Sequence, residues 1–221
     1  MPPTTDHKPT DHRSTDHHSA GHDSTGLLTA EALDAAAPAL AGLLIDAVRA
    51  GASVGFPADL TDEAATAWWR ARVDAVAAGA LSVPPAGPAG APLGTVSLAL
   101  EQYPNGAHRA EIGKLLVHST ARRRGLGRTL LALAERAAAE RGRTLLLLDT
   151  ETDSDAELLY RSSGWTALGT VPGYAADPAG TLRPSTFFYK HLDAAEHPGT
   201  SDAAATTTAA GTSTAAAARP S

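Results

Sequence analysis

The 221-residue chain contains no cysteine, which excludes disulfide bonds and thiolate-zinc sites. It has no apolar run near the roughly 18 residues that a membrane helix needs, and it opens with no secretory pattern. Its formal net charge of −6 gives no electrostatic reason to expect nucleic-acid binding. We therefore expect a cytoplasmic protein with no nucleic-acid or membrane partner.

The chain is long enough, with 43% hydrophobic residues, for one domain with a real core. Residues 1–26 are polar and repeat Thr-Asp-His, so too little can be buried there to offset the entropy of ordering. A disordered tail is favoured over a weak nickel, copper or zinc binder, although imidazole and carboxylate suit those ions. Alanine- and threonine-rich residues 193–221 predict a second tail, which leaves 27–192 as the domain.

Hydrophobic periodicity and turn residues predict a mixed α/β domain. The expected helices cover residues 30–50, 61–78, 125–141 and 153–163, with Thr61 capping the second. The expected strands cover residues 27–29, 81–83, 93–102, 108–117, 144–149, 165–171 and 186–191, and residues 52–60 and 84–92 are expected loops. Antiparallel strands followed by strand-helix-strand indicate a mixed sheet rather than a doubly wound one.

The most informative motif is Arg-x-x-Gly-x-Gly at residues 122–127, between an apolar strand and a periodic helix. The first amides of a helix lack internal partners and the helix dipole is positive there, so glycines at that point suit phosphate binding. The Gly-Lys-Ser/Thr ending of a nucleoside-triphosphate loop is absent. A dinucleotide fingerprint would need glycine at Leu130 and a first glycine much closer to Val117.

In this context the motif resembles the coenzyme A loop of the GNAT family of acetyl-coenzyme A-dependent N-acetyltransferases. Residues 51–56, 109–111, 148–151 and 172–175 further resemble the tabtoxin-resistance branch, whose members acetylate an amino-acid-like toxin. The resemblance spans roughly residues 27–192. It implies a mostly antiparallel twisted sheet flanked by helices, acetyl-CoA as co-substrate, no metal, and direct attack in a ternary complex.

The resemblance also implies the catalytic residues. Tyr160 corresponds to the tyrosine whose hydroxyl protonates the departing thiolate; the alternative is a core aromatic with a wet hydroxyl. Glu111 and Asp149 are expected to face the acceptor amine, either as the base or as an anchor for its charge. His118 follows the strand, and we expect it to point away from the reacting atoms.

The remaining site residues are expected around these three. The cofactor is expected to contact the strand end and the loop, at Leu115, Leu116, Val117, Arg122, Arg123, Arg124, Gly125, Leu126, Gly127 and Arg128. Backbone amides are expected to bind most of the phosphate, because not every arginine can reach it. The acceptor is expected to contact Ser53, Phe56, Trp68 and Tyr174, with one of Trp68 and Trp69 packed in the core.

The sequence thus predicts an N-acetyltransferase acting on a small amino-acid-like metabolite or antibiotic. Two alternatives stay open: acetylation of a protein amino group, and a non-catalytic module that binds acyl-CoA. A monomer and a homodimer are both compatible with the sequence.

Overall fold

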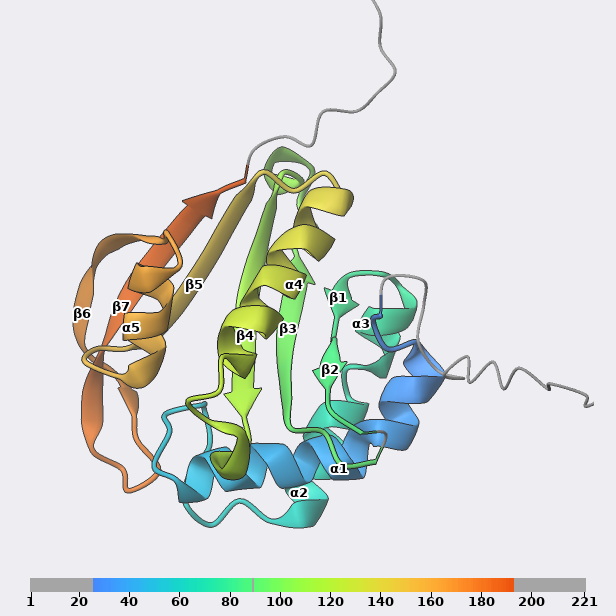
Figure 1. Cartoon of the computed structure of the whole chain (residues 1–221), viewed down its shortest axis with the longest axis vertical. Coiled ribbons are helices and arrows are strands. Elements are labelled where there is room, and N and C mark those ends of the chain that lie inside the picture. Colours follow the sequence, from blue (N-terminus) through green and yellow to red (C-terminus); the bar gives the residue numbers. More distant parts are fainter. Residues whose placement is uncertain (1–25, 89, 193–221) are drawn as a thin grey trace, which may run out of the picture.

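The computed structural model describes residues 26–88 and 90–192, so the predicted tails, apart from Gly26, lie outside the described residues. The strands form one sheet in the order β1-β3-β4-β5-β7-β6, with β2 paired to β3 (Figure 1). The strands are β1 (Leu81–Ser82), β2 (Pro85–Ala86), β3 (Gly94–Leu100), β4 (Arg109–Val117), β5 (Leu145–Glu151), β6 (Thr166–Ala176) and β7 (Leu182–His191). The helices are α1 (Ala30–Arg49), α2 (Asp62–Arg70), α3 (Val73–Ala77), α4 (Leu126–Glu140) and α5 (Asp155–Ser162), with short 3-10 turns Pro104–Gly106 and Ser119–Ala121.

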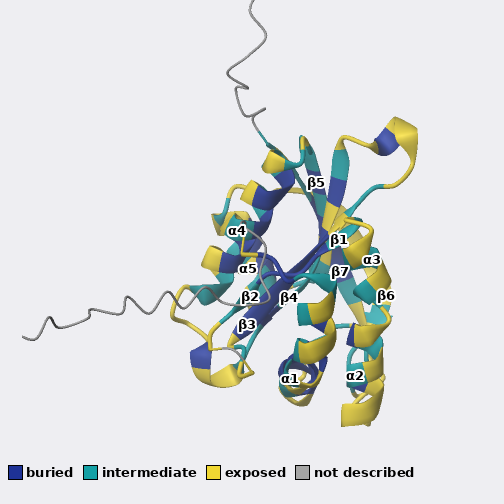
Figure 2. Ribbon diagram, turned by 90° about the vertical axis from the view of Figure 1, so that its right-hand side faces the viewer, coloured by how far each residue is buried: buried dark blue, intermediate teal, exposed yellow. Residues whose placement is uncertain are grey.

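Helices cover both faces of the sheet. Helices α4 and α5 lie on one side and α1 to α3 on the other, with buried residues between the layers (Figure 2). Thr29 caps α1 by accepting a hydrogen bond from the Ala32 amide, and the helix then buries a stripe that includes Leu33, Leu40 and Leu44. The predicted mixed, mostly antiparallel sheet is confirmed.

Strands β4 and β5 are the one parallel pair of neighbours in the described sheet. Their pairing ends at Glu111 and Leu147, although β4 continues to Val117 and β5 to Glu151. On its other edge β4 stays paired with β3 up to Val117. The two strands therefore separate at their carboxyl ends, which leaves the second edge of β4 without a neighbouring strand.

A kink in β4 changes which face its side chains reach. Lys114 has φ 48°, a left-handed value that only a local irregularity of the strand allows. Before it, Ile112 packs in the core beneath α4; after it, Leu116 packs with α1 on the opposite face. The side-chain alternation is thus inverted around Lys114, at the level where β4 and β5 part.

Several predicted elements were wrong in detail. Residues 27–29 form no strand; Leu28 makes a single bridge, its amide donating to the Val83 carbonyl. The helix expected over 61–78 breaks into α2 and α3, because the Arg72 guanidinium donates to the Trp68 carbonyl that a continuous helix would use. The Arg72 amide bonds to Trp69 instead.

The other errors concern strand lengths. Strand β6 continues to Ala176, so Tyr174 lies in a strand rather than in the expected loop, because pairing with β7 resumes at Ala175 and Ala176 after an irregularity that follows Val171. The expected loop 84–92 contains the two-residue strand β2, which pairs with β3.

Among the described residues, no helix is long and apolar enough to span a membrane.

Candidate active site

The loop before α4 presents unused backbone donors. Arg123 has φ 63° and Gly125, the residue before the helix, has φ 84°. The N–H groups from Arg123 to Arg128 donate to no acceptor within the described part of the chain. They combine with the positive end of α4, which makes this loop suited to bind phosphate oxygens.

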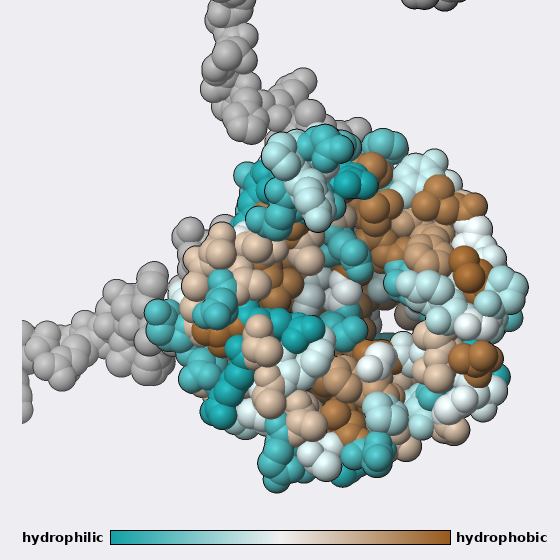
Figure 3. All heavy atoms as spheres, turned by 180° about the vertical axis from the view of Figure 1, so that it is seen from behind, coloured by the Kyte–Doolittle hydropathy of each residue, from teal (hydrophilic) through white to brown (hydrophobic). Residues whose placement is uncertain are grey.

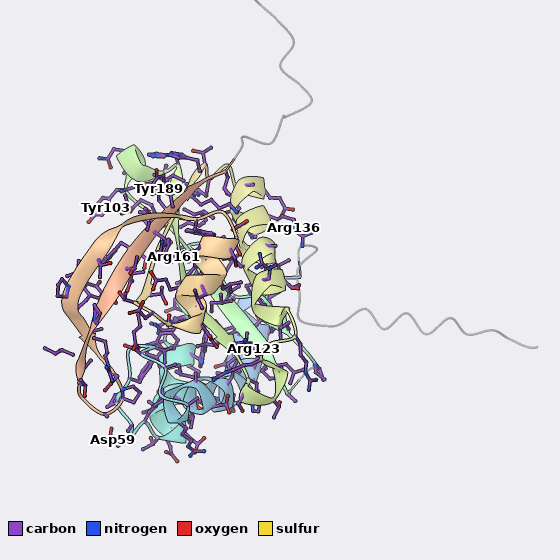
Figure 4. All side chains as sticks on the ribbon, turned by 60° about the vertical axis from the view of Figure 1, so that its left-hand side comes forward. Asp59, Tyr103, Arg123, Arg136, Arg161 and Tyr189 are labelled. Carbon is purple, nitrogen blue, oxygen red and sulfur yellow. The ribbon has the colours of Figure 1, made fainter. Side chains whose placement is uncertain are left out.

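The arginines of the loop have different surroundings. Arg122 donates through Nε to the Val117 carbonyl, and Arg128 donates to the Ser162 carbonyl and to two serine hydroxyls. These two side chains therefore brace the loop against β4 and α5. Arg123 is exposed, 3.4 Å from Asp155, and lies where α4 begins (Figure 4); Arg124 is also exposed. This division supports the prediction that backbone amides carry most of the phosphate contact.

Close packing explains the second glycine of the motif. A Cβ on Gly127 would lie 3.3 Å from the Leu159 side chain and 3.7 Å from that of Val117. The glycine thus lets the start of α4 approach both β4 and α5. Leu126 packs beside it against the core. Leu115 to Val117, the predicted pantetheine contacts, lie on the part of β4 that has no strand on its β5 side.

Asp46 of α1 holds the strand-to-loop junction, a contact that the sequence did not suggest. Its carboxylate accepts hydrogen bonds from the Ser119 amide and hydroxyl, both at 2.8 Å. Burial opposes ionisation, but these bonds, with His118 and Arg122 nearby, hold the pKa of Asp46 below its ordinary value. The His118 ring lies 3.7 Å from the same carboxylate. His118 thus pairs with α1, in line with the expectation that it is not the base.

Glu111 and Asp149 share one face of the sheet. Ala110, Ile112 and Leu148 beside them pack beneath α4, so strand alternation directs the two carboxylates to the opposite face. They lie where β4 and β5 begin to part. Asp149 is exposed to solvent on one side and enclosed by protein on others. This partial burial raises the pKa of its carboxyl, although the positive charge of Lys114 and a hydrogen bond with Ser185 act to lower it.

Tyr160 lies on α5 and is 5% exposed. Its ring contacts Trp165 edge-on and Phe188 at an angle, with centroids 5.9 and 6.0 Å away. Burial and then the charge of Asp149 raise the pKa of its hydroxyl, so the group is protonated at neutral pH. Such a hydroxyl can donate a proton or a hydrogen bond. Both interpretations of Tyr160, general acid and core aromatic, are compatible with this packing.

The acceptor-side segments, distant in sequence, meet in space. The Ser53 hydroxyl donates to the Ala176 carbonyl at 3.2 Å, and the Ala58 amide donates to the Pro178 carbonyl. The loop after α1 is thereby joined to the turn between β6 and β7. Phe56 stands edge-on to Trp68 at 5.5 Å, and Tyr174 stands edge-on to Phe187 at 5.0 Å.

Trp68 and Trp69 have different surroundings. Trp69 is fully buried, whereas Trp68 lines a pocket of about 160 Å³ on the face of the sheet that carries Glu111. Seen from behind, this side of the molecule is hollowed, and polar and apolar residues meet around the hollow (Figure 3). Arg72 and Lys114 line the same pocket, and sequence reasoning missed both. The sequence feature that could have indicated Lys114 is its position within an apolar strand, because the chain has three lysines in all.

In the part of the chain that the structure describes, no group of three or more His, Cys, Asp or Glu residues could hold a metal ion. The candidate site thus comprises a loop with unused backbone donors at a helix start, a parallel strand pair that separates, and two carboxylates on one face of the sheet near that separation. Tyr160 is buried on α5.

The model of the acetyltransferase (GNAT) family matches residues 45–165, from α1 through the loop, α4 and α5. The chain belongs to the GNAT acetyltransferase family. It is accordingly an acetyl-CoA-dependent N-acetyltransferase. The match spans the separated strands and the glycine loop, so the features assembled above are those of the family's domain.

Solved structures of other acetyltransferases resemble this one. A ribosomal-protein-alanine N-acetyltransferase from Brucella melitensis is 27% identical, with TM-score 0.60, covering 72% of this chain and 96% of that one. A GCN5-related N-acetyltransferase from Kribbella flavida is also 27% identical, with TM-score 0.58 and coverage of 72% and 94%. The putative acetyltransferase yncA from Salmonella typhimurium, solved with acetyl-CoA, is 22% identical, with TM-score 0.59 and coverage of 75% and 94%. This last likeness shows the fold alone.

Proposed function

We propose that the enzyme transfers acetyl from acetyl-CoA to the amino group of a small amino-acid-like molecule, a metabolite or an antibiotic, by direct attack in a ternary complex. The observation that carries the proposal is that two segments on the expected acceptor side are hydrogen-bonded to each other. There, Ser53 and Ala58 are hydrogen-bonded to Ala176 and Pro178. We infer that a loop held in this way favours a small acceptor over a folded protein surface.

For the cofactor, we assign the pyrophosphate to the amides from Arg123 to Arg128 and the pantetheine to the free edge of β4 at Leu115–Val117. A β-strand edge offers alternating donors and acceptors, and the pantetheine arm carries amides that can pair with them. One amide there would also polarise the thioester carbonyl. With the pyrophosphate and the pantetheine arm bound in this way, the acetyl group would lie in the gap between β4 and β5.

The reaction needs two proton transfers. A neutral amine nitrogen attacks the thioester carbonyl, a carbon–nitrogen bond forms, and the carbon–sulfur bond breaks. We assign the amine's proton to Asp149 or Glu111, and the proton for the departing sulfur to Tyr160. The raised pKa of Asp149 makes it a better proton acceptor than an ordinary aspartate, and the raised pKa of Tyr160 keeps its proton available. The absence of cysteine is compatible with direct attack.

The acceptor class is tested by a panel that follows thiol release. It compares free amino acids and amino-acid-like antibiotics with alanine-terminated and lysine-containing peptides. We expect the small amines to have the higher catalytic efficiency. A tenfold preference for peptides would overturn the proposal and favour protein acetylation, the activity named for the Brucella relative.

Within the small amines, a toxin related to tabtoxin is the finer proposal, resting on residues 51–56 and 172–175. The first segment belongs to the loop that reaches β6, and the second lies within β6. The cytoplasmic location and the homodimer stay predictions.

A further inference from the structure

A pocket of about 160 Å³ opens beside the carboxylates, between the β3–β4 face of the sheet and the junction of α2 and α3. Ser97 and Glu111 reach it from the two paired strands, and Lys114 reaches it from the kink of β4. Trp68 and Arg72 close it from the helical side. None of the residues that line this pocket belongs to the loop that is expected to bind the cofactor.

Two cations in this pocket have no carboxylate partner. Arg72 and Lys114 are both half-buried, yet neither forms an ion pair with any residue that the structure describes. The Arg72 guanidinium lies 3.1 Å above the Trp68 ring, and the Lys114 ammonium lies 5.5 Å from the same ring. Partly buried cations that form no ion pair favour an anion beside them.

A neutral donor in the pocket is also unused. Ser97 is 7% exposed, and its buried hydroxyl has no hydrogen-bond partner in the described structure. A buried hydroxyl without a partner costs free energy, so such groups are rare and call for a ligand or water. Ser97 pairs in register with Gly113, next to Lys114, so this hydroxyl and the lysine belong to the same small region.

Charges of both signs lie around the pocket. Burial, and then the charge of Arg72, lower the pKa of Lys114, whereas the negative charges of Asp149 and Glu111 raise it. Glu111 lines the pocket together with Arg72 and Lys114. One cation, Arg72, comes from the α2–α3 junction and the other, Lys114, from β4, and carboxylates lie toward the separated strands. This arrangement complements a molecule that carries both an ammonium and an anion.

We propose that this pocket is the subsite for the carboxylate of the acceptor, held by Lys114 and Arg72 with a hydrogen bond from Ser97. The acceptor's amino group then points toward Asp149 and Glu111, where acetyl transfer takes place. The pocket thereby selects amino acids over simple amines. This inference rests on the proposed function, because the occupant is the acceptor of that reaction.

The first test compares acceptors that differ only in the carboxylate: L-lysine with cadaverine, L-ornithine with putrescine, and γ-aminobutyrate with propylamine. Wild-type enzyme should have at least tenfold higher catalytic efficiency for the acid of the best pair. Lys114→Met and Arg72→Met should each reduce this preference roughly 10- to 100-fold, the usual effect of a charged hydrogen bond. A preference absent from wild type, or kept in both variants, overturns the proposal.

Arg70→Met is the matched control for charge. Arg70 lies on α2 near Arg72, but it pairs with Asp34 on the exposed side and does not line the pocket. Its loss removes the same charge from the same region and should leave the preference within about twofold of wild type. A loss equal to that of Arg72→Met would mean a general electrostatic effect and would overturn the assignment to the pocket.

The second test needs no turnover and no variant. Lysine labelled with ¹³C at Cε gives three signals in this chain, from Lys8, Lys114 and Lys190. With coenzyme A present, titration by γ-aminobutyrate should shift the Lys114 signal saturably, whereas propylamine should not and Lys190 should stay still. Ser97→Ala should weaken this binding severalfold. If neither γ-aminobutyrate nor propylamine shifts the Lys114 signal, the proposed carboxylate subsite is overturned.

The two tests separate this inference from the function on which it rests. If no small amine is acetylated but Lys114 still responds to the acid, the subsite stands and the proposed function fails. If small amines are acetylated without regard to their carboxylates and Lys114 does not respond, the function stands and the subsite fails.

Discussion

Replacing Gly125 by alanine tests whether the loop before α4 binds the cofactor through its backbone. Gly125 has φ 84°, and a Cβ there would meet nothing within 4 Å. The substitution therefore adds no clash, only the cost of a left-handed conformation, about 1–2 kcal/mol for a residue other than glycine. The free loop can relax away from that conformation, because its amides make no bond to the described protein.

Cofactor binding must then restore the conformation, so the cost is expected in affinity. Since 1.4 kcal/mol is a factor of ten, the dissociation constant for acetyl-CoA should rise about 5- to 30-fold in isothermal titration calorimetry. Gly125→Asn should lose less, because asparagine tolerates the left-handed region. Gly125→Glu should lose more, since it adds a negative charge where phosphate is expected.

Gly142 provides the control at the other end of the same helix. It has φ 70°, and a Cβ there would also meet nothing within 4 Å. Gly142→Ala carries the same strain away from the loop, so it should lower the melting temperature without changing acetyl-CoA affinity. Unchanged affinity in a folded Gly125→Ala variant would refute the reasoning about this loop.

Three further predictions concern the reacting groups and the loop's support. Tyr160→Phe keeps the ring packing and removes the proton, so turnover should fall ~100- to 10,000-fold at nearly constant acetyl-CoA affinity; full turnover with chemistry rate-limiting would remove Tyr160 from the mechanism. Asp149→Asn and Glu111→Gln should separate base from anchor: loss of the base removes the acidic limb of the rate profile, which for Asp149 lies above its ordinary pKa of 3.8, whereas loss of an anchor mainly raises the Michaelis constant. Asp46→Asn should lower the melting temperature at neutral pH. Because the folded pKa of Asp46 lies below the ordinary 3.8, its stabilisation is complete above that value and lost as pH falls through the folded pKa, so thermal melts of variant and wild type should converge in acid. Melts that stay equally far apart at all pH values would contradict the role of the Asp46 charge.

Local signals in the sequence were enough for the main elements. The Thr61 side chain accepts from the amide three residues on, as its predicted role as a helix cap requires, and the periodicity of residues 30–50 was enough to predict α1. The glycine loop between a strand and a helix was recognisable because its function depends on backbone conformation at consecutive residues. Caps, periodicity and glycine placement act over a few residues, so a single sequence contains them.

Strand lengths and breaks were harder because distant partners decide them. Residues 172–176 contain Pro172 and Gly173 and were predicted to be a loop, but β7 lies alongside and β6 continues. The break between α2 and α3 likewise depends on where one long side chain turns: Arg72 takes the Trp68 carbonyl and stacks on its ring. No pattern in the hydrophobic residues marks either event.

The sequence by itself determined the GNAT-like loop and the order of the main elements, and it predicted Glu111, Asp149 and Tyr160 as the reacting groups. Only the tertiary structure decided that Ser53 meets Ala176, and that Arg72, Ser97 and Lys114 line one pocket beside Glu111. The reason is physical: charge and hydrogen-bonding capacity belong to each residue, whereas a subsite exists only where the kink of β4 and the break after α2 bring such residues within reach of one ligand.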